Sequence, residues 1–308
     1  MSGTALELAR PDVWRTVLEQ LPTGVYLLDH DQKIVFWNAG AERITGLLRQ
    51  DVVGRCTRDQ LVSRGGNGTA TELPEDSPVL SALRDGRCSE SEVFLHHKDG
   101  YRVPVSLRTF AVRDASGHVI GAAESFEESI ASSEWDRRQS KLESYGCLHV
   151  ATGVLSREFT ESHVRESLTT FYTHPVPFAV FCIQADNLEQ VRGKYGPRAA
   201  HDILRVVGQT LEHSLRPNDF VGYWEEDEFL ALVAECSRSE IEKVAERLKR
   251  MVSYSEIKWW GDAIRISVSL GGTTVCPGDT LELLLQRAHQ AMSTSINAGG
   301  DRLTILEV

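Results

Sequence analysis

The sequence predicts an α+β protein with two domains: an antiparallel sheet with short helices, followed by an α/β domain with a mixed sheet. Strand-like runs and short helices fill the chain up to residue 128, whereas after residue 148 apolar strands alternate with amphipathic helices. Residues 129–147 between them are polar, lack proline and consist of good helix formers. A chain of 308 residues with 41% hydrophobic content is long enough for two such cores.

The first half predicts two strands, short helices and then three more strands. Apolar residues alternate in "GVYLLDHDQKIVFWN", which predicts two strands around a polar turn. Helical spacing follows in "AGAERITGLLRQDVVGR", expected to be one helix that stops at Gly54, and in "PVLSALRDG", which ends at Gly86. The last three strands are expected in "SESEVFLHH", "RVPVSLRTFAVRD" and "VIGAAESFEE", separated by "KDG" and "ASG" turns.

This half resembles a PAS sensor domain over residues 20–128. The segment "VFWNAGAERITGL" stands where that family has an asparagine between a strand and a helix. The Asp99–Gly100 turn in "HHKDGYRVPVSLR" is similar to the later part of the family. The resemblance implies a sensing or dimerising domain, and the sequence does not identify a ligand for it.

Two helical segments flank the PAS-like region. Residues 1–19 are expected to form an N-terminal helical segment, and residues 129–147 a linker helix with a thin apolar stripe. The linker fits either a signalling helix that pairs with its counterpart in a homodimer or a helix surrounded by solvent.

The second half predicts an α/β domain. Strands are expected in "FAVFCIQ", "DFVGYW", "EFLALVAE", "IRISVSLGGTTV" and "RLTILEV", and helices in "AAHDILRVVGQTLEHSL", "RSEIEKVAERLKRMV" and "TLELLLQRAHQAMSTSI". A tight acidic turn, "EEDE", joins two of the strands.

Composition narrows the class of protein. The formal net charge of −11 argues against a nucleic-acid partner. No stretch is apolar enough for a signal peptide or a membrane span. The six cysteines form no Cys-x-x-Cys pair, so we expect a cytoplasmic protein with reduced thiols.

Residues 148–308 resemble a GGDEF domain, the fold of the diguanylate cyclases, which is similar to nucleotide cyclases and polymerase palms. The order of elements matches from "HVATGVLSREF", which corresponds to the family pattern D-x-L-T-G-L-x-N-R-x-x-F, to the end. The resemblance implies condensation of two GTP into cyclic di-GMP. Such phosphoryl transfer needs divalent cations held by carboxylates, a glycine turn near the phosphates, a guanine pocket and a lysine.

The chain departs from the family at each of these positions. The glycine pair falls on Glu225 and Glu226, and the DEF residues on Asp227, Glu228 and Phe229. The metal-binding aspartate of the preceding strand falls on Gln184, whose amide is a weaker ligand for Mg²⁺, while Asp186 remains at the segment's second aspartate. Residues also differ at the positions of other family side chains: Ser156 and His149 in the opening motif, Glu189 at a lysine, Arg192 and His201 at the guanine contacts, and Ile296 and Gly300 at the C-terminal Lys and Arg. Together these changes predict a GGDEF domain without a catalytic or metal site.

One family feature is retained. In "RPND", Arg216 and Asp219 have the spacing of the family's R-x-x-D inhibitory site, and Arg247 falls on its second arginine. The resemblance implies cyclic di-GMP binding, since arginine forks bind phosphates and guanine edges and aspartate accepts from guanine N1 and N2. The alternative is that these arginines form only surface salt bridges, because a four-residue pattern is common.

The sequence leaves three hypotheses for function. The first is a non-enzymatic PAS–GGDEF signalling protein that binds cyclic di-GMP, docks a protein of that pathway, or does both. The second is an active diguanylate cyclase that uses Asp227 and Glu228 in an atypical site. The third is a protein-interaction scaffold that binds no nucleotide. No cofactor is expected beyond cyclic di-GMP.

Overall fold

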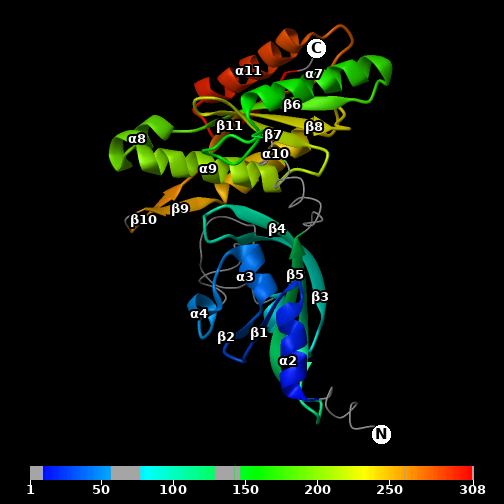
Figure 1. The fold of residues 1–308 in the computed structure, drawn as a ribbon, viewed down its shortest axis with the longest axis vertical. Helices are drawn as coiled ribbons and strands as arrows, with labels where there is room; N and C mark the ends of the chain where they lie inside the picture. Colours follow the sequence, from blue (N-terminus) through cyan, green and yellow to red (C-terminus); the bar gives the residue numbers. More distant parts are fainter. Residues whose placement is uncertain (1–9, 57–76, 129–141, 143–145, 260, 307–308) are drawn as a thin grey trace. The chain divides into compact units, whose positions relative to one another are not determined.

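The computed structural model describes residues 10–56, 77–128, 142, 146–259 and 261–306 (Figure 1). The chain forms two compact units. The first is built on a five-stranded sheet with the order β2-β1-β5-β4-β3, in which the described neighbours β2–β1, β1–β5 and β5–β4 are antiparallel. Its strands are β1 (Gly24–Leu28), β2 (Ile34–Trp37), β3 (Ser89–His96), β4 (Arg102–Arg113) and β5 (Val119–Glu128). The two-plus-three arrangement of strands predicted from the sequence is confirmed.

Short helices accompany this sheet, and one prediction for them is wrong. The segment expected to be a single helix up to Gly54 forms two, α3 (Ala39–Thr45) and α4 (Arg49–Val52). Gly46 ends α3 in the left-handed region at φ 68°, a conformation that glycine adopts readily. The other helices of this unit are α2 (Pro11–Gln20) and α5 (Pro78–Asp85), and α5 ends at Gly86 as predicted.

The asparagine of the PAS-like segment connects the sheet to its helices. Asn38 is fully buried, and its Oδ1 accepts hydrogen bonds from the backbone nitrogens of Val25 and Ala41, both at 2.8 Å. Its side-chain nitrogen donates to the carbonyls of Leu18 and Thr23, both at 2.9 Å. One buried side chain therefore caps α3 and fixes the chain on either side of β1.

Aromatic side chains fill the core of the first unit. Tyr26, Trp37 and Phe126 are all at most 1% exposed, with ring centroids 5.4 to 6.3 Å apart. Glu124 lies among them at 1% exposure and accepts hydrogen bonds from Tyr26 and Thr109. Large aromatics at these distances contribute both buried area and edge contacts to stability.

The predicted linker helix falls largely outside the described residues, since 129–141 and 143–145 are not among them. The same holds for residues 1–9 of the predicted N-terminal segment, while its remainder coincides with the start of α2. Within the described residues, no helix is long and apolar enough to cross a membrane.

The second unit is a mixed five-stranded sheet between two layers of helices. The strand order is β12-β11-β6-β8-β7, and only the β11–β12 pair is parallel. The strands are β6 (Phe178–Ala185), β7 (Phe220–Glu225), β8 (Glu228–Ala234), β11 (Val268–Thr274) and β12 (Leu303–Ile305). In Figure 1, α7 (Arg157–Thr173) and α11 (Leu281–Asn297) cover one face, and α9 (Pro197–His213) and α10 (Ile241–Ser253) cover the other.

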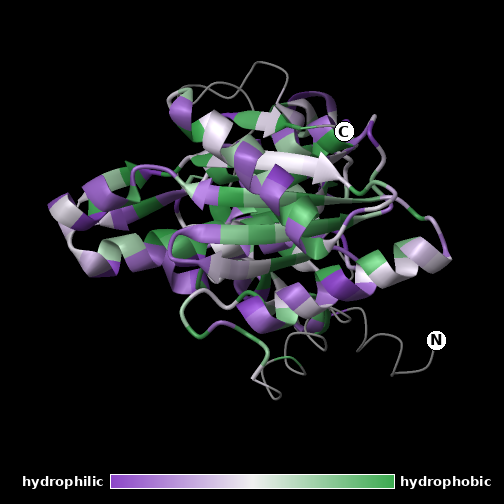
Figure 2. Cartoon of the chain, turned by 90° about the horizontal axis from the view of Figure 1, so that it is seen from above, coloured by the Kyte–Doolittle hydropathy of each residue, from purple (hydrophilic) through white to green (hydrophobic). Residues whose placement is uncertain are grey.

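The apolar run of β6 is buried on both faces. Phe181 and Ile183 pack into the core beneath α9 and α10, whereas Val180 and Cys182 pack into the core beneath α11. This explains why the run is continuous instead of alternating. Helices have one buried and one exposed face, and Figure 2 shows hydrophilic and hydrophobic residues interspersed along them. Gly271 of β11 is a close-approach site, because a Cβ there would lie 1.9 Å from the backbone nitrogen of Met292 in α11.

Three elements of the second unit differ from the prediction or were missed by it. The strand expected over "IRISVSLGGTTV" is divided into β10 (Asp262–Arg265) and β11, and β10 pairs with β9 (Glu256–Trp259) in a separate two-stranded sheet. Helices α7 and α8 (Leu188–Tyr195) were not predicted. Both are weakly amphipathic: α7 buries only Thr160, Val164 and Leu168, and α8 buries only Leu188.

Candidate functional site

The acidic run forms a tight hairpin turn. Glu225 ends β7 and lies opposite Glu228, the first residue of β8, with Glu226 and Asp227 between them. Glu226 has φ 36°, in the left-handed region where glycine is favoured. The carbonyl of Asp227 accepts a hydrogen bond from Ala185 N at 3.2 Å. The turn therefore lies beside the end of β6.

Three acids of this turn form ion pairs, each with a cation from a different helix. Glu225 pairs with Arg157 of α7 at 2.8 Å, Asp227 with Arg192 of α8 at 3.5 Å, and Glu228 with His289 of α11 at 3.1 Å. Arg192 also pairs with Glu189. Partial burial raises the pKa of Asp227, and the Arg192 guanidinium opposes this shift.

The second carboxylate of this region is also engaged. Asp186 accepts hydrogen bonds from the hydroxyls of Ser267 and Ser269 at 2.8 and 2.7 Å and from Asp301 N at 2.9 Å. Asp186 thus holds the start of β11 and the turn after α11. Gln184 lies opposite Glu228 in the β6–β8 pair. Within the described ranges, no group of three or more His, Cys, Asp or Glu side chains is placed to hold a metal ion.

The opening-motif residue His149 lies near His201, one of the two positions where the family reads guanine. The ring of His149 stacks on Tyr223 of β7, with centroids 3.9 Å apart and planes within 3°. Burial lowers the pKa of His149, and the nearby His201 of α9 lowers it further. Ser156, in the opening motif, caps α7 by accepting from Phe159 N at 3.4 Å.

The remaining two family positions lie near the C-terminus. Ile296 is 37% exposed on α11 and so faces solvent at the place of the family's lysine. Gly300 has φ 75°, and a Cβ there would lie 3.2 Å from Asp186 Oδ1. A side chain at residue 300 would therefore be strained as well as close to that carboxylate.

The R-x-x-D residues form an ordered turn before β7. Asp219 Oδ2 accepts from Arg216 N at 2.9 Å, and Asp219 Oδ1 accepts from Ala234 N at 3.0 Å. The backbone is closed by Asp219 N donating to the Arg216 carbonyl at 2.9 Å. Asp219 is only 4% exposed, and burial raises its pKa against the effect of these hydrogen bonds. In this conformation Asp219 stabilises the turn, and little of it is accessible to a ligand.

The structure brings Arg247 to the same place. Arg247 lies on α10, and its charge interacts with those of Asp219 and Arg216. Its Nε is buried and has no hydrogen-bond partner among the described residues. Burial lowers the pKa of Arg247, as expected for a guanidinium removed from water. The three residues predicted to act together are thus neighbours, and one of them has an unmatched donor.

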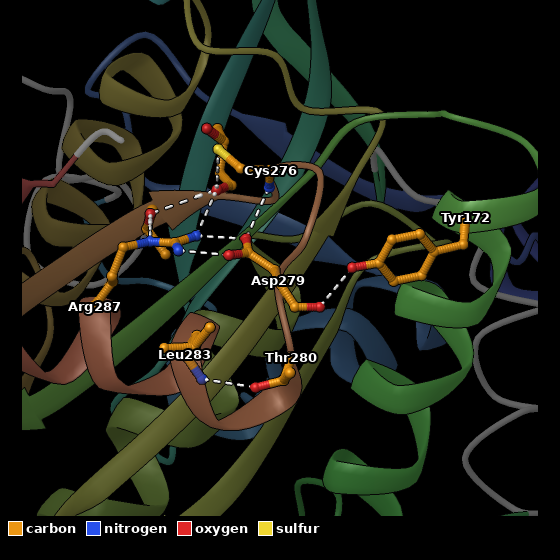
Figure 3. Close-up of polar contacts among 8 residues, drawn as sticks. Tyr172, Cys276, Asp279, Thr280, Leu283 and Arg287 are labelled. Carbon is orange, nitrogen blue, oxygen red and sulfur yellow. Dashed lines mark hydrogen bonds and ion pairs between the residues drawn. The ribbon is translucent and has the colours of Figure 1, made fainter.

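A clamp not predicted from the sequence fixes this end of the sheet (Figure 3). Arg287 of α11 forms a bidentate pair with Asp279, with both N···O distances 2.6 Å. Arg287 also donates to the Thr274 carbonyl, and Tyr172 of α7 donates to the Asp279 carbonyl at 2.7 Å. Thr274 pairs with Ala179 at the start of β6, the end of the sheet opposite to the acidic turn. The clamp joins β11, α11 and α7 at this end of the sheet.

Comparison with known proteins agrees with both halves of the fold. Residues 149–302 match the family model "Diguanylate cyclase, GGDEF domain", and residues 22–128 match a PAS domain model. The chain is 25% identical over 295 residues to the probable diguanylate cyclase DgcE of Escherichia coli K12, covering 94% of this chain and 26% of DgcE. It is 26% identical over 159 residues to the diguanylate cyclase DosC of the same strain, covering 51% of this chain and 35% of DosC. The chain therefore spans only a quarter to about a third of these relatives.

Solved structures show the same fold for the second unit. The coiled coil and GGDEF domain of DgcB from Caulobacter crescentus, solved with c-di-GMP, aligns with TM-score 0.51 and 17% identity over 57% of this chain and 95% of that one. The diguanylate cyclase SiaD of Pseudomonas aeruginosa, solved with its activator SiaC, aligns with TM-score 0.50 and 21% identity over 57% of this chain and 70% of that one. The chain belongs to the GGDEF-domain family, homologous to diguanylate cyclases, and carries a PAS domain ahead of its GGDEF domain.

Proposed function

We propose that this protein is a PAS–GGDEF signalling protein whose GGDEF domain does not condense GTP and instead binds cyclic di-GMP at Arg216, Asp219 and Arg247. The observation that carries the proposal is the buried Arg247 Nε without a partner, placed beside Arg216 in an otherwise hydrogen-bonded turn. A buried donor left unmatched costs about 1–3 kcal/mol, so a rearrangement of Arg247 that pairs Nε with an anionic ligand would be favoured by about that amount.

Each residue has a different task in the proposed site. Arg216 and Arg247 present guanidinium groups that can bind a phosphate or the O6 and N7 acceptors of guanine. Asp219 accepts two backbone hydrogen bonds and so orders the turn that carries Arg216. The clamp of Arg287 and Asp279 keeps this end of the sheet in place. A preordered turn lowers the entropy lost on binding.

Isothermal titration calorimetry with cyclic di-GMP tests this site. We expect binding by the full chain and a tenfold or greater loss of affinity in Arg216→Ala and in Arg247→Ala, since each removes a charged hydrogen-bond donor. Arg250→Ala is the matched control, because Arg250 lies exposed on the same helix and should leave the affinity unchanged. Absence of heat in the wild type would refute ligand binding and favour the scaffold that binds no nucleotide.

The active enzyme is the second candidate, favoured by the similarity to relatives named as diguanylate cyclases. Against it, Gln184 stands in place of a carboxylate, and Asp227 is paired with Arg192. Incubation of the purified chain with GTP and Mg²⁺ or Mn²⁺ separates the candidates by product formation. We expect no cyclic di-GMP; turnover that disappears in Asp227→Ala would establish the enzyme instead.

The proposal extends to assembly and location. We infer a cytoplasmic homodimer formed through the PAS domain and the segment 129–147, which docks a protein of the cyclic di-GMP pathway. The diguanylate cyclase SiaD, whose fold is similar to that of the second unit, was solved in complex with its activator SiaC, and this supports a protein partner. Multi-angle light scattering of the chain against a version that begins at residue 146 tests the dimer, since only the full chain should have twice its monomer mass.

A further inference from the structure

The acidic hairpin is surrounded by cations that come from the protein itself. Arg157, Arg192 and His289 lie on three different helices, and each contacts a different acid of the turn. Arg157 also lies over the Trp224 ring, 4.8 Å from its centroid, which fixes the outer arm of the hairpin to α7. The turn is therefore tied to helices on both faces of the sheet.

The contacts of His289 suit its cationic form. Its Nδ1 lies 3.0 Å from the carbonyl of Leu285, and its Nε2 lies 3.1 Å from Glu228 Oε2. A backbone carbonyl and a carboxylate both accept hydrogen bonds, so the imidazolium form, which has an N–H on each ring nitrogen, suits this pair of partners. The hydrogen bonds with Cys182 and Glu228 raise the pKa of His289 to about 11, which agrees with that assignment.

The residues present do not fit the divalent cation that the family implies. Mg²⁺ and Mn²⁺ are held by carboxylates with free lone pairs in a near-octahedral set. Here Gln184 offers an uncharged amide, Asp186 already accepts three hydrogen bonds, and Asp227 faces a guanidinium. The guanidinium of Arg192 beside Asp227 would also repel a divalent ion directly.

We propose that Arg192 and His289 are built-in counter-ions that take the place of a divalent cation and hold the hairpin without metal or nucleotide. Asp227 is 15% exposed and Glu228 23%, so each carboxylate is partly removed from water and needs a positive partner. The inference rests on the proposed loss of catalysis and is independent of ligand binding at Arg216 and Arg247, so the two can fail separately.

Two explanations for the missing metal site can be distinguished. Either the metal-binding carboxylate at residue 184 has been lost, or the side-chain cations occupy the place of the metal ion. If only the ligand were lost, Gln184→Asp alone would restore metal binding. If the cations occupy the position, Gln184→Asp must be combined at least with Arg192→Asn before a metal ion can bind, and His289→Gln should strengthen that binding further. Mn²⁺ alone, followed by electron paramagnetic resonance of the free ion, reports this without nucleotide or activity.

We expect no Mn²⁺ bound at the hairpin in the wild type or in Gln184→Asp, and at least tenfold tighter binding in the triple variant. Adding Asp227→Asn to the triple variant should abolish the gain in Mn²⁺ affinity. Replacing Arg192→Asn by Arg192→Lys in the triple variant should reduce that gain, because the positive charge is kept. Binding by Gln184→Asp equal to that of the triple variant would overturn the proposal. So would wild-type binding that Asp227→Asn removes.

A second measurement covers the case in which the triple variant does not fold. The melting temperature of the wild type should be the same in 5 mM MgCl₂ and in EDTA, because no metal holds the hairpin. The milder Gln184→Asp/Arg192→Asn variant should be stabilised by MgCl₂ relative to EDTA. A metal-dependent melting temperature in the wild type that is lost in Asp227→Asn, or no response in the double variant, would contradict the inference.

Discussion

The charged side chains at the two ends of the GGDEF sheet differ in how deeply they are buried and in how they are paired. At the hairpin end, Asp227 and Glu228 are matched by cations whose side chains are 42% and 35% exposed. At the opposite end, Asp279 and Arg287 form a bidentate pair only 6% and 19% exposed, and Arg247 of α10, beside the R-x-x-D turn, has a buried nitrogen without a partner in the described chain. At the hairpin end, the charges of the acids are neutralised by ion pairs that are accessible to water. The opposite end combines a rigid frame with an unmatched donor, which is the arrangement that suits an anionic ligand.

The largest expected effect comes from breaking the buried clamp. Arg287→Ala leaves Asp279 nearly buried without its charged partner, so we expect the free energy of unfolding to fall by about 3 kcal/mol. Urea unfolding followed by circular dichroism measures this. Arg165→Ala is the control, because the Arg165–Glu161 pair is 56% and 35% exposed and should contribute less than about 0.5 kcal/mol. Equal losses of unfolding free energy in the two variants would contradict the proposed difference between buried and exposed ion pairs.

Asp219 gives the next effect, on the ordered turn. Asp219→Ala removes acceptors for Arg216 N and Ala234 N, and we expect a loss of about 2 kcal/mol in the free energy of unfolding. Asp219→Asn keeps one oxygen acceptor and should lose about half as much. Both variants should also weaken cyclic di-GMP binding, because the turn carries Arg216. A variant that loses affinity with unchanged stability would instead assign Asp219 to direct ligand contact.

At the hairpin end, we expect His289 to make a pH-dependent contribution to the free energy of unfolding. Its pKa in the folded protein is about 11, above the ordinary value of 6.5, so the stability it contributes is complete below pH 6.5 and declines as the pH rises towards 11. Because the side chain is 35% exposed, solvent screening limits the effect to about 1 kcal/mol. The difference in unfolding free energy between wild type and His289→Gln should therefore shrink from pH 6 to pH 10. A difference independent of pH would indicate a neutral imidazole.

Much of the fold followed from local patterns. The apolar run of β6 and the stripes of α9 and α10 exist because those residues are buried, so their period predicted the elements. Helix α7 was missed because it buries few residues. The division of the predicted helix at Gly46 was missed because a left-handed φ does not change the spacing of hydrophobic residues. The separation of β9 and β10 from the main sheet depends on tertiary packing that no window of sequence contains.

The proximity of the three R-x-x-D residues was predictable from the sequence, but the contacts of the individual side chains were not. Arg216, Asp219 and Arg247 were named from motif spacing, and the structure brings them together. The pairing of His289 with Glu228 joins residues 61 positions apart, and no sequence spacing encodes it. The missing hydrogen-bond partner of Arg247 Nε likewise results from tertiary packing. The sequence of α10 does not indicate which of its arginine side chains has a buried nitrogen.

The smallest effect distinguishes the two residues at the family's glycine positions. Glu226 adopts φ 36°, where a non-glycine residue is strained by about 1 kcal/mol, so Glu226→Gly should raise the free energy of unfolding by about 0.5 kcal/mol after the added entropy of glycine in the unfolded chain. Glu225 is the matched control: it lies in β7 and pairs with Arg157, so Glu225→Gly should lower stability by about 1 kcal/mol. Thermal unfolding of both variants should therefore show shifts of opposite sign. Two destabilising shifts would mean that the contacts of Glu226, rather than its backbone conformation, determine how the turn tolerates an acid in place of glycine.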